Sequence, residues 1–269
     1  MYQKRVIAFI DILGFRNIVS KTANNQKLTE KIFAVLNAMK SENISNEMFI
    51  GMMPGIPENE LEDVKEVAAL FSKALKGESS IQVTHFSDSI VISVGMENEM
   101  NVMSVLEYIG RLIYNLWNEF KILIRGAITI GELVHVENGA LFGPAMVEAY
   151  DLETNLANYP RIIIDEYTSK CIKTSPIFEK MENLFMDFTN EKNVKDRIFK
   201  IENGLEINLV SSLNHLLNSQ FAFNQEKKLE MESVLNNATL ELTTLKMESN
   251  RWEVQEKYDY LIDLIKNQS

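Results

Sequence analysis

Two aspartates interrupt apolar runs of β-strand type, and their carboxylates are the first candidates for chemistry in this chain. Asp11 follows the apolar residues 6–10, and Asp88 separates two short β-type runs, IQVTHF and IVISV. A carboxylate inside a buried strand is costly unless it is paired or metal-bound, so we expect both acids at strand ends, where they could bind cations. The alternatives are a helix cap for Asp11 and a local hydrogen bond in a turn for Asp88.

A glycine follows the first aspartate closely. Gly14 permits a tight turn between the opening strand and a helix expected over residues 15–20. A strand end that combines an acid with such a turn can hold a metal and can offer backbone N–H groups to a phosphate.

Arg125 is a further candidate, because it stands inside an apolar strand predicted over residues 121–134. A lone arginine there requires an anionic partner, and the sequence leaves open whether that partner is a protein carboxylate or a phosphate. His135 is expected in the polar turn that follows and is not predicted to bind a metal. Asp151, three residues after Glu148, is expected on a solvated acidic face of a helix.

The elements that would position these residues alternate between β-type and helical patterns. An α/β fold with helices against a mixed sheet is therefore predicted. The expected elements are a strand (6–10), helices (15–20 and 28–39), a short strand and loop (42–60), a helix (61–75), a hairpin (80–94), a helix (101–120), a second hairpin (121–142), a helix (143–155) and a strand (161–164).

The chain changes character from about residue 183. Two β-type runs, residues 184–188 and 197–201, are expected to pair as edge strands, and residues 208–217 are expected to form a helix. Residues 220–266 contain neither glycine nor proline and combine many charges with spaced leucines. They predict a helical hairpin that packs on the domain or on a second subunit.

Composition and charge limit the classes of function. The chain has 269 residues, of which 46% are hydrophobic, and a formal net charge of -11, which argues against binding to nucleic acid or to an anionic membrane. No apolar run approaches the roughly 20 residues that span a bilayer, and the N-terminal run lacks a signal-peptide pattern. The single cysteine, Cys171, fits a reducing compartment, so a cytoplasmic location is expected.

Four motifs in order resemble class III nucleotidyl cyclases. FIDILGF is similar to their first metal-binding motif, HFSDSIVIS to their second, RGAITIGEL to the strand that follows, and GPAMVEAYDLE to the helix that carries their transition-state residues. Together the motifs cover about residues 4–165. RGAITIGEL, GPAMVEAYDLE, YPRIIID and the KYDYL of the helical tail resemble more closely the bacterial pyrimidine cyclases of the Pycsar antiphage system.

The resemblance implies a site and a reaction. Asp11 and Asp88, with the carbonyl of Ile12, would hold two Mn²⁺ or Mg²⁺ ions, for which oxygen ligands are suited. The substrate-binding residues would be Leu13, Gly14 and Phe15, whose amides meet the phosphates, together with Thr84 and Arg125. Arg125 is also the catalytic candidate that stabilises phosphate charge. The implied enzyme is a homodimer with its active site at the interface, which makes cyclic UMP or cyclic CMP from UTP or CTP for a separate effector protein.

Departures from the family pattern leave a second hypothesis open. Thr84 and Ala140 replace the two purine-reading residues, which fits a pyrimidine base, and the choice of uracil rests on the resemblance alone. Val147 and Asp151 replace the transition-state asparagine and arginine. Either Arg125 acts with Glu148 or Tyr150 instead, or the chain is a catalytically silent, dimeric nucleotide-binding module. The predicted domains are a cyclase-like catalytic domain over residues 1–204 and a helical extension over residues 205–269.

Overall fold

The computed structural model describes residues 1–38, 40, 81–96, 100–136, 139–175, 178–195, 197–219 and 225–267. Within these residues the predicted architecture is confirmed, because helices flank a mixed sheet and a helical hairpin ends the chain. The short strand and loop expected over residues 42–60 and the helix expected over residues 61–75 lie outside the described residues.

The sheet is organised around its first strand, β1 (Gln3–Ile12). This strand pairs antiparallel with β3 (Ser89–Gly95) along one edge and with β4 (Ile124–His135) along the other. The order across the sheet is β2-β3-β1-β4-β6-β8-β7, and the short β5 pairs with the end of β4. The remaining strands are β2 (Gln82–Phe86), β5 (Leu141–Phe142), β6 (Ile162–Ile164), β7 (Phe185–Val194) and β8 (Arg197–Ile207).

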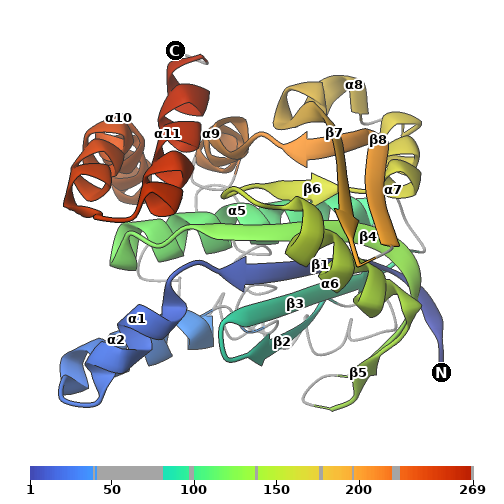
Figure 1. Cartoon of the computed structure of the whole chain (residues 1–269), viewed down its shortest axis with the longest axis horizontal. Coiled ribbons are helices and arrows are strands. Elements are labelled where there is room, and N and C mark those ends of the chain that lie inside the picture. Colours follow the sequence, from blue (N-terminus) through green and yellow to red (C-terminus); the bar gives the residue numbers. More distant parts are fainter. Residues whose placement is uncertain are drawn as a thin grey trace.

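Different helices cover the two faces of the central strands (Figure 1). The face that carries Val6, Ala8 and Ile10 packs in one core cluster with α5 (Met100–Phe120). The face that carries Ile7 and Phe9 packs against α6 (Pro144–Leu156). Because side chains alternate along a strand, Asp11 lies on the same face as Phe9, which is the α6 face.

The second half of the sheet is built around a crossover. β4 and β6 are parallel, and α6 lies in the connection that parallel neighbours require. The hairpin of β7 and β8 was predicted from the sequence, and residues 197–201 pair with β7 alone, but the C-terminal part of β8 does not lie at the edge. β8 pairs with β6 as well as with β7, because the apolar residues near its C-terminal end complete the core.

The remaining helices flank these central layers, and the longest of them is α10 near the C-terminus. Asp165 caps the N-terminus of α7, and its carboxylate accepts the N–H of Thr168. The bounds are α1 (Phe15–Thr22), α2 (Gln26–Ala38), α7 (Glu166–Lys173), α8 (Phe178–Met181), α9 (Leu209–Ser219), α10 (Gln225–Glu248) and α11 (Trp252–Lys266), with a 3₁₀ turn at Glu182–Leu184.

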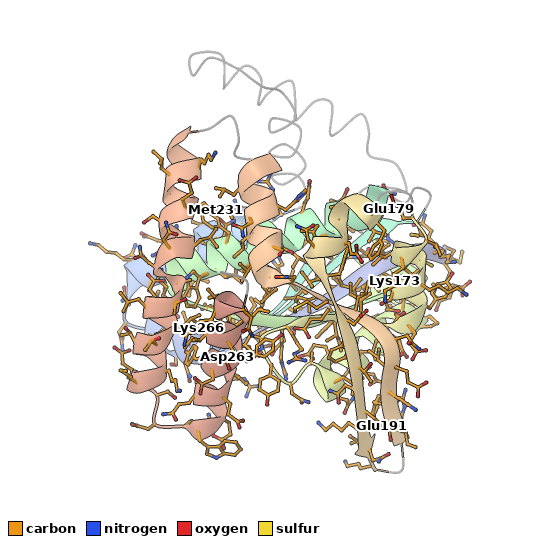
Figure 2. All side chains as sticks on the ribbon, turned by 90° about the horizontal axis from the view of Figure 1, so that it is seen from above. Lys173, Glu179, Glu191, Met231, Asp263 and Lys266 are labelled. Atoms are coloured by element: carbon orange, nitrogen blue, oxygen red, sulfur yellow. The ribbon has the colours of Figure 1, made fainter. Side chains whose placement is uncertain are left out.

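The C-terminal helices pack on the domain that precedes them. Figure 2 shows α10 and α11 at one end of the molecule and the β7–β8 hairpin, which carries Glu191, at the other. Leu242 of α10 and Leu261 and Ile262 of α11 are buried in the main core. β8 runs past residue 204, so the predicted domain boundary falls inside a strand, and the division into two domains stays a prediction. None of the described helices has the length and apolarity needed to cross a bilayer.

Candidate active site

The fold brings the two predicted metal-binding aspartates to the same end of neighbouring strands. Asp11 lies near the end of β1 and is paired in register with Ser89, which directly follows Asp88 in the turn between β2 and β3. The N–H of Ile12 donates to the carbonyl oxygen of Asp88 at 2.7 Å. The carboxylates are partly accessible, with 21% of the Asp11 side chain and 34% of the Asp88 side chain exposed. Two acids that are far apart in the sequence thus lie at the same end of neighbouring strands, where both carboxylates are partly accessible.

The turn after β1 is open, as its glycine suggested. Gly14 has φ of 77°, a left-handed conformation that favours glycine, and a Cβ placed there would meet no atom within 4 Å. It caps α1, whose first residue is Phe15. The amide of Leu13 is already used, because it donates to the carbonyl oxygen of Leu123 at 2.9 Å. Of the three amides predicted to meet phosphate, those of Gly14 and Phe15 are therefore the better candidates.

Arg125 lies between two carboxylates. Its Nε is 3.0 Å from Oδ2 of Asp11 and 2.7 Å from Oε1 of Glu153, and its Nη1 donates to the carbonyl oxygen of Ala157 at 3.4 Å. The carboxylates of Asp11 and Glu153 are thus the anionic partners of Arg125 within the protein. A contact between Arg125 and a phosphate stays a prediction. About a quarter of the Arg125 side chain is exposed, so an approaching anion can reach it.

Glu153 was missed by the reading of the sequence. Its side chain is only 3% exposed, and burial raises the pKa of its carboxyl while the nearby Arg125 lowers it. Glu153 follows Ala149 by four residues on the buried stripe of α6. An acid on the apolar stripe of the helix that crosses over the Arg125 strand is the signal that could have revealed this partner.

Lys257 on α11 was also missed. The pKa of its ammonium group is lowered by burial and then by the charge of Arg125, whereas Asp11 raises it. The C-terminal helix therefore brings a second cation into the electrostatic field of the Asp11 carboxylate. Because α11 is distant from β1 in the sequence, only the packing of the helices reveals this relationship.

Thr84 lies in β2 and bonds to a buried histidine. Its Oγ1 is 2.8 Å from Nε2 of His135, and Nδ1 of His135 is 2.8 Å from Oγ of Ser93. Arg5, also buried, donates from Nε to the same Ser93 oxygen at 2.9 Å. The expectation that His135 lies in a turn is wrong, because β4 extends through it. Its ring shares the sheet face of Leu133, two residues earlier, and is 8% exposed.

The outer face of α6 carries the remaining candidates. Val147 is 59% exposed, and the ring of Tyr150, 50% exposed, packs edge-on against Phe9 at 5.4 Å. Glu148 has a raised carboxyl pKa, caused by burial and by Asp165 and Asp151. The prediction that Asp151 is solvated is wrong, because its Oδ2 lies 2.7 Å from Nη1 of Arg197 and its side chain is 18% exposed.

The donor set fits hard divalent cations. Two partly accessible carboxylates and the nearby carbonyl of Ile12 are oxygen ligands of the kind that Mg²⁺ and Mn²⁺ prefer. In the described part of the chain no group of three or more His, Cys, Asp or Glu side chains could hold a metal ion, so other oxygen ligands, such as water, carbonyl or phosphate oxygens, would complete the coordination. Arg125 shares Asp11, and Arg16 lies 4.0 Å from Asp88.

A cavity of about 270 Å³ lies between α5, the start of β4 and the C-terminal helices. Among the described residues its lining is mostly apolar and contains no carboxylate. Representative lining residues are Trp117, Ile124, Leu213, Met231, Ala238 and Leu261.

Comparison with known proteins gives a partial likeness to cyclases. No protein family model and no curated protein sequence matches the chain. The adenylyl cyclase CyaB from P. aeruginosa matches with a TM-score of 0.46 and 13% identity over 77% of this chain and 94% of that one.

Two further solved structures match in the same way. The catalytic core of a rhodopsin-guanylyl cyclase with converted specificity, in complex with ATPαS, matches with a TM-score of 0.43 and 15% identity over 77% and 96% of the two chains. A bacterial light-regulated adenylyl cyclase matches with a TM-score of 0.40 and 12% identity over 88% and 98%. TM-scores this low carry no argument about function, so the function of this chain has to be argued from its own residues.

Proposed function

We propose that this protein is a pyrimidine nucleotide cyclase that converts UTP, or CTP, into the 3′,5′-cyclic nucleotide and pyrophosphate. The observation that supports this function best is the meeting of Asp11 and Asp88 beside the open Gly14 turn. Two partly accessible carboxylates beside an open glycine turn at one strand end suit a metal-bound triphosphate. The alternatives of a helix cap and a turn hydrogen bond account for neither the proximity of the two acids nor the open space above Gly14.

Each residue has a distinct task in this proposal. Asp11 and Asp88 bind the metals with the carbonyl of Ile12, and the amides of Gly14 and Phe15 bind phosphate oxygens. Two divalent cations held there would lower the pKa of the ribose 3′-hydroxyl and neutralise the leaving pyrophosphate. Arg125 offers its guanidinium to the phosphate while Glu153 and Asp11 keep its side chain in place.

The residues that would read the base support a pyrimidine. Thr84 is a short side chain in β2, and Ala140 lies exposed in the turn between β4 and β5. Neither provides the long or charged group that the resemblance associates with purine recognition. Because the same motifs resemble the Pycsar cyclases, we propose that the product is a second messenger of antiphage defence, formed in the cytoplasm by a homodimer and sensed by a separate effector.

A silent nucleotide-binding module is the second candidate, and one observation favours it. At the positions where the resemblance expects an asparagine and an arginine, Val147 is exposed and Asp151 is held by Arg197. α6 therefore offers no amide and guanidinium pair for a transition state at these positions. An active enzyme has to use Arg125 with Glu148 or Tyr150 in their place.

Incubation with Mn²⁺ and each of the four ribonucleoside triphosphates, followed by mass spectrometry, tests the proposal. We expect a cyclic pyrimidine nucleotide from the unaltered protein and none from Asp11→Asn or Asp88→Asn. Asp187→Asn is the matched control, because Asp187 is an acid of β7 whose side chain is 89% exposed, and it should leave product formation unchanged. Full activity in either site variant would contradict the metal-binding role.

The same samples separate the two candidate functions. A silent module shows no product, but UTP or CTP with Mn²⁺ raises its Tm, because a ligand that binds the native state stabilises it. Absence of both product and stabilisation would contradict a nucleotide site of either kind.

A further inference from the structure

One N–H group of Arg125 lies beside two carboxylates and donates to only one of them. The Nε atom of an arginine carries a single hydrogen, and here it is donated to Oδ2 of Asp11 at 3.0 Å. Oε1 of Glu153 lies closer to the same nitrogen, at 2.7 Å, yet within the described residues it accepts no hydrogen bond. The site therefore contains two acceptors for one donor, and Glu153 is the acceptor that is left without it.

The oxygen without a hydrogen bond belongs to a buried side chain. Glu153 is 3% exposed, and its other oxygen, Oε2, accepts from Oγ1 of Thr154 at 3.0 Å. A buried oxygen that accepts no hydrogen bond is costly. Because the oxygens of Asp11 and Glu153 both lie within 3.0 Å of Nε, a small rotation of the guanidinium plane moves the hydrogen from one carboxylate to the other while α6 stays in place.

A divalent cation bound to Asp11 would change the balance between the two acceptors. The cation offsets the negative charge of this carboxylate, whichever of its two oxygens it binds, and it also repels the guanidinium group of Arg125. Glu153 is not among the proposed metal-binding residues and keeps its own charge. Glu153 is then the stronger acceptor for the Nε–H.

We propose that Glu153 is a positioning residue that accepts the Nε–H of Arg125 in place of Asp11 when a divalent cation binds Asp11. This inference rests on the proposed function, because it takes Asp11 as a metal-binding residue. Before the cation binds, Arg125 balances the charge of Asp11, and afterwards Glu153 keeps the guanidinium in the site. Within the described residues Nη2 forms no hydrogen bond, and about a quarter of the arginine side chain is exposed. This nitrogen is therefore free to contact an anion in both states.

The first test needs neither a metal nor a reaction. In protein labelled with ¹⁵N-arginine, ¹H–¹⁵N spectra at pH 7 measure how fast the Arg125 Nε–H exchanges with water, and Arg125→Lys identifies its signal. We expect slow exchange in Asp11→Ala, where Glu153 accepts the hydrogen, and in Glu153→Met, where Asp11 accepts it. In the double variant the exchange should be about tenfold faster or more. Fast exchange in Asp11→Ala alone would overturn the proposal.

The second test adds the cation to the same labelled proteins. Mg²⁺ is titrated alone and together with α,β-methylene-UTP, whose methylene bridge prevents the release of pyrophosphate. In the unaltered protein the Arg125 Nε–H signal should shift but stay in slow exchange, because its acceptor changes from Asp11 to Glu153. In Glu153→Met the same addition should make the exchange about tenfold faster or more. Exchange that responds equally in both proteins, or in neither, would overturn the proposal.

The affinity for the cation gives an independent measure. Mn²⁺ binding, followed by electron paramagnetic resonance, should be roughly three- to tenfold weaker in Glu153→Met, because the displaced guanidinium then has no carboxylate to accept it. Asp151→Ala is the matched control, since Asp151 is an acid of the same helix that pairs with Arg197 at 2.7 Å. It should change neither the Mn²⁺ affinity nor the exchange. Equal Mn²⁺ affinities in Glu153→Met and the unaltered protein would contradict the proposal.

The failure of this inference is distinguishable from that of the proposed function. If no nucleoside triphosphate is cyclised, the function fails, while the exchange of the Arg125 Nε–H in the variants still decides the inference. If a cyclic nucleotide forms but Mg²⁺ leaves the exchange in Glu153→Met slow, the hydrogen stays with Asp11. The inference then fails and the function stands.

Discussion

At the scale of single residues, Arg125 determines the charge of the candidate site. It contacts the accessible Asp11 on one side and the buried Glu153 on the other. Two carboxylates share this one guanidinium, whose N–H groups are donors that a phosphate can also accept from. The cluster therefore combines a cation-binding acid and an anion-binding group within one salt-bridge network.

Replacing Arg125 should lower the unfolding free energy, because the buried Glu153 carboxylate then lacks its cation. Arg125→Met leaves the Glu153 carboxylate buried without its cation, and breaking a buried pair from one side costs about 3–5 kcal/mol. Urea denaturation at pH 7 measures this loss of unfolding free energy. In the Arg125→Met background, Glu153→Gln should restore a large part of it, because the amide carries no charge. An Arg125→Met protein within about 1 kcal/mol of the unaltered protein would contradict the importance of this pair.

His135 should make the stability depend on pH in the acid range. Its folded pKa is lowered to about 4, first by burial and then by Arg5, whereas an unfolded histidine has a pKa of about 6.5. The native state thus favours the neutral ring, so the contribution is full above pH 6.5 and is lost as the pH falls towards 4. The loss is about 3 kcal/mol.

The measurement is the difference in unfolding free energy between the unaltered protein and His135→Gln across this pH range. His85, whose pKa is also lowered by burial, is present in both proteins, so its contribution cancels in the difference. A difference that stays constant from pH 6.5 to pH 4 would show that His135 titrates normally in the folded state.

At the scale of elements, the close approach of β1 and β4 positions Asp11 beside Arg125. Gly126 makes this close approach possible. A Cβ on Gly126 would lie 2.5 Å from the carbonyl oxygen of Phe9 and 2.6 Å from Cδ1 of Ile10. The first of these neighbours is backbone of β1, so the strands would have to separate to accommodate a methyl group. Gly126 thus fixes the spacing of the two strands that carry the acid and its arginine.

Gly126→Ala should therefore destabilise the protein by about 3 kcal/mol or more. Gly14→Ala is the informative comparison, because a Cβ there meets open space but the φ of 77° is unfavourable, which costs about 1–2 kcal/mol. Thermal and urea unfolding of both variants measure the difference. Equal losses at the two positions would contradict the steric role of Gly126.

Several parts of the site could be predicted because the sequence pattern that indicates them spans only a few neighbouring residues. An acid that interrupts an apolar run must leave the core, so the strand-end placement of Asp11 followed from residues 6–11 alone. Glu153 and Lys257 could not be found in the same way, because their relation to Arg125 depends on how α6 and α11 are rotated against the sheet. His135 was misplaced because the polar residues after it suggested a turn, whereas the alternation from Leu133 continues the strand through the histidine.

At the scale of the whole molecule, the C-terminal helices complete the same core that holds the site. Leu242, Leu261 and Ile262 share the main cluster with β1 and α5, and the stacked rings of Tyr159 and Tyr260 join α11 to the segment before β6. Arg161 lies over the Tyr260 ring, 4.5 Å from its centroid, and pairs with Glu206 of β8 at 3.1 Å. α11 is thus fixed to the sheet, and with it Lys257, whose pKa responds to the charges of Arg125 and Asp11.

The cavity between these helices and the sheet gives the last prediction. Ala238 of α10 lines the cavity of about 270 Å³ with a small side chain. Ala238→Leu would bury additional apolar surface there, adding about 1 kcal/mol to the unfolding free energy and raising Tm by roughly 2–4 °C. Calorimetry measures the shift, and Ala238→Ser, which adds no apolar volume at the same position, should not raise Tm. A lower Tm for Ala238→Leu would show that α10 packs against the sheet more tightly than a cavity of this volume allows.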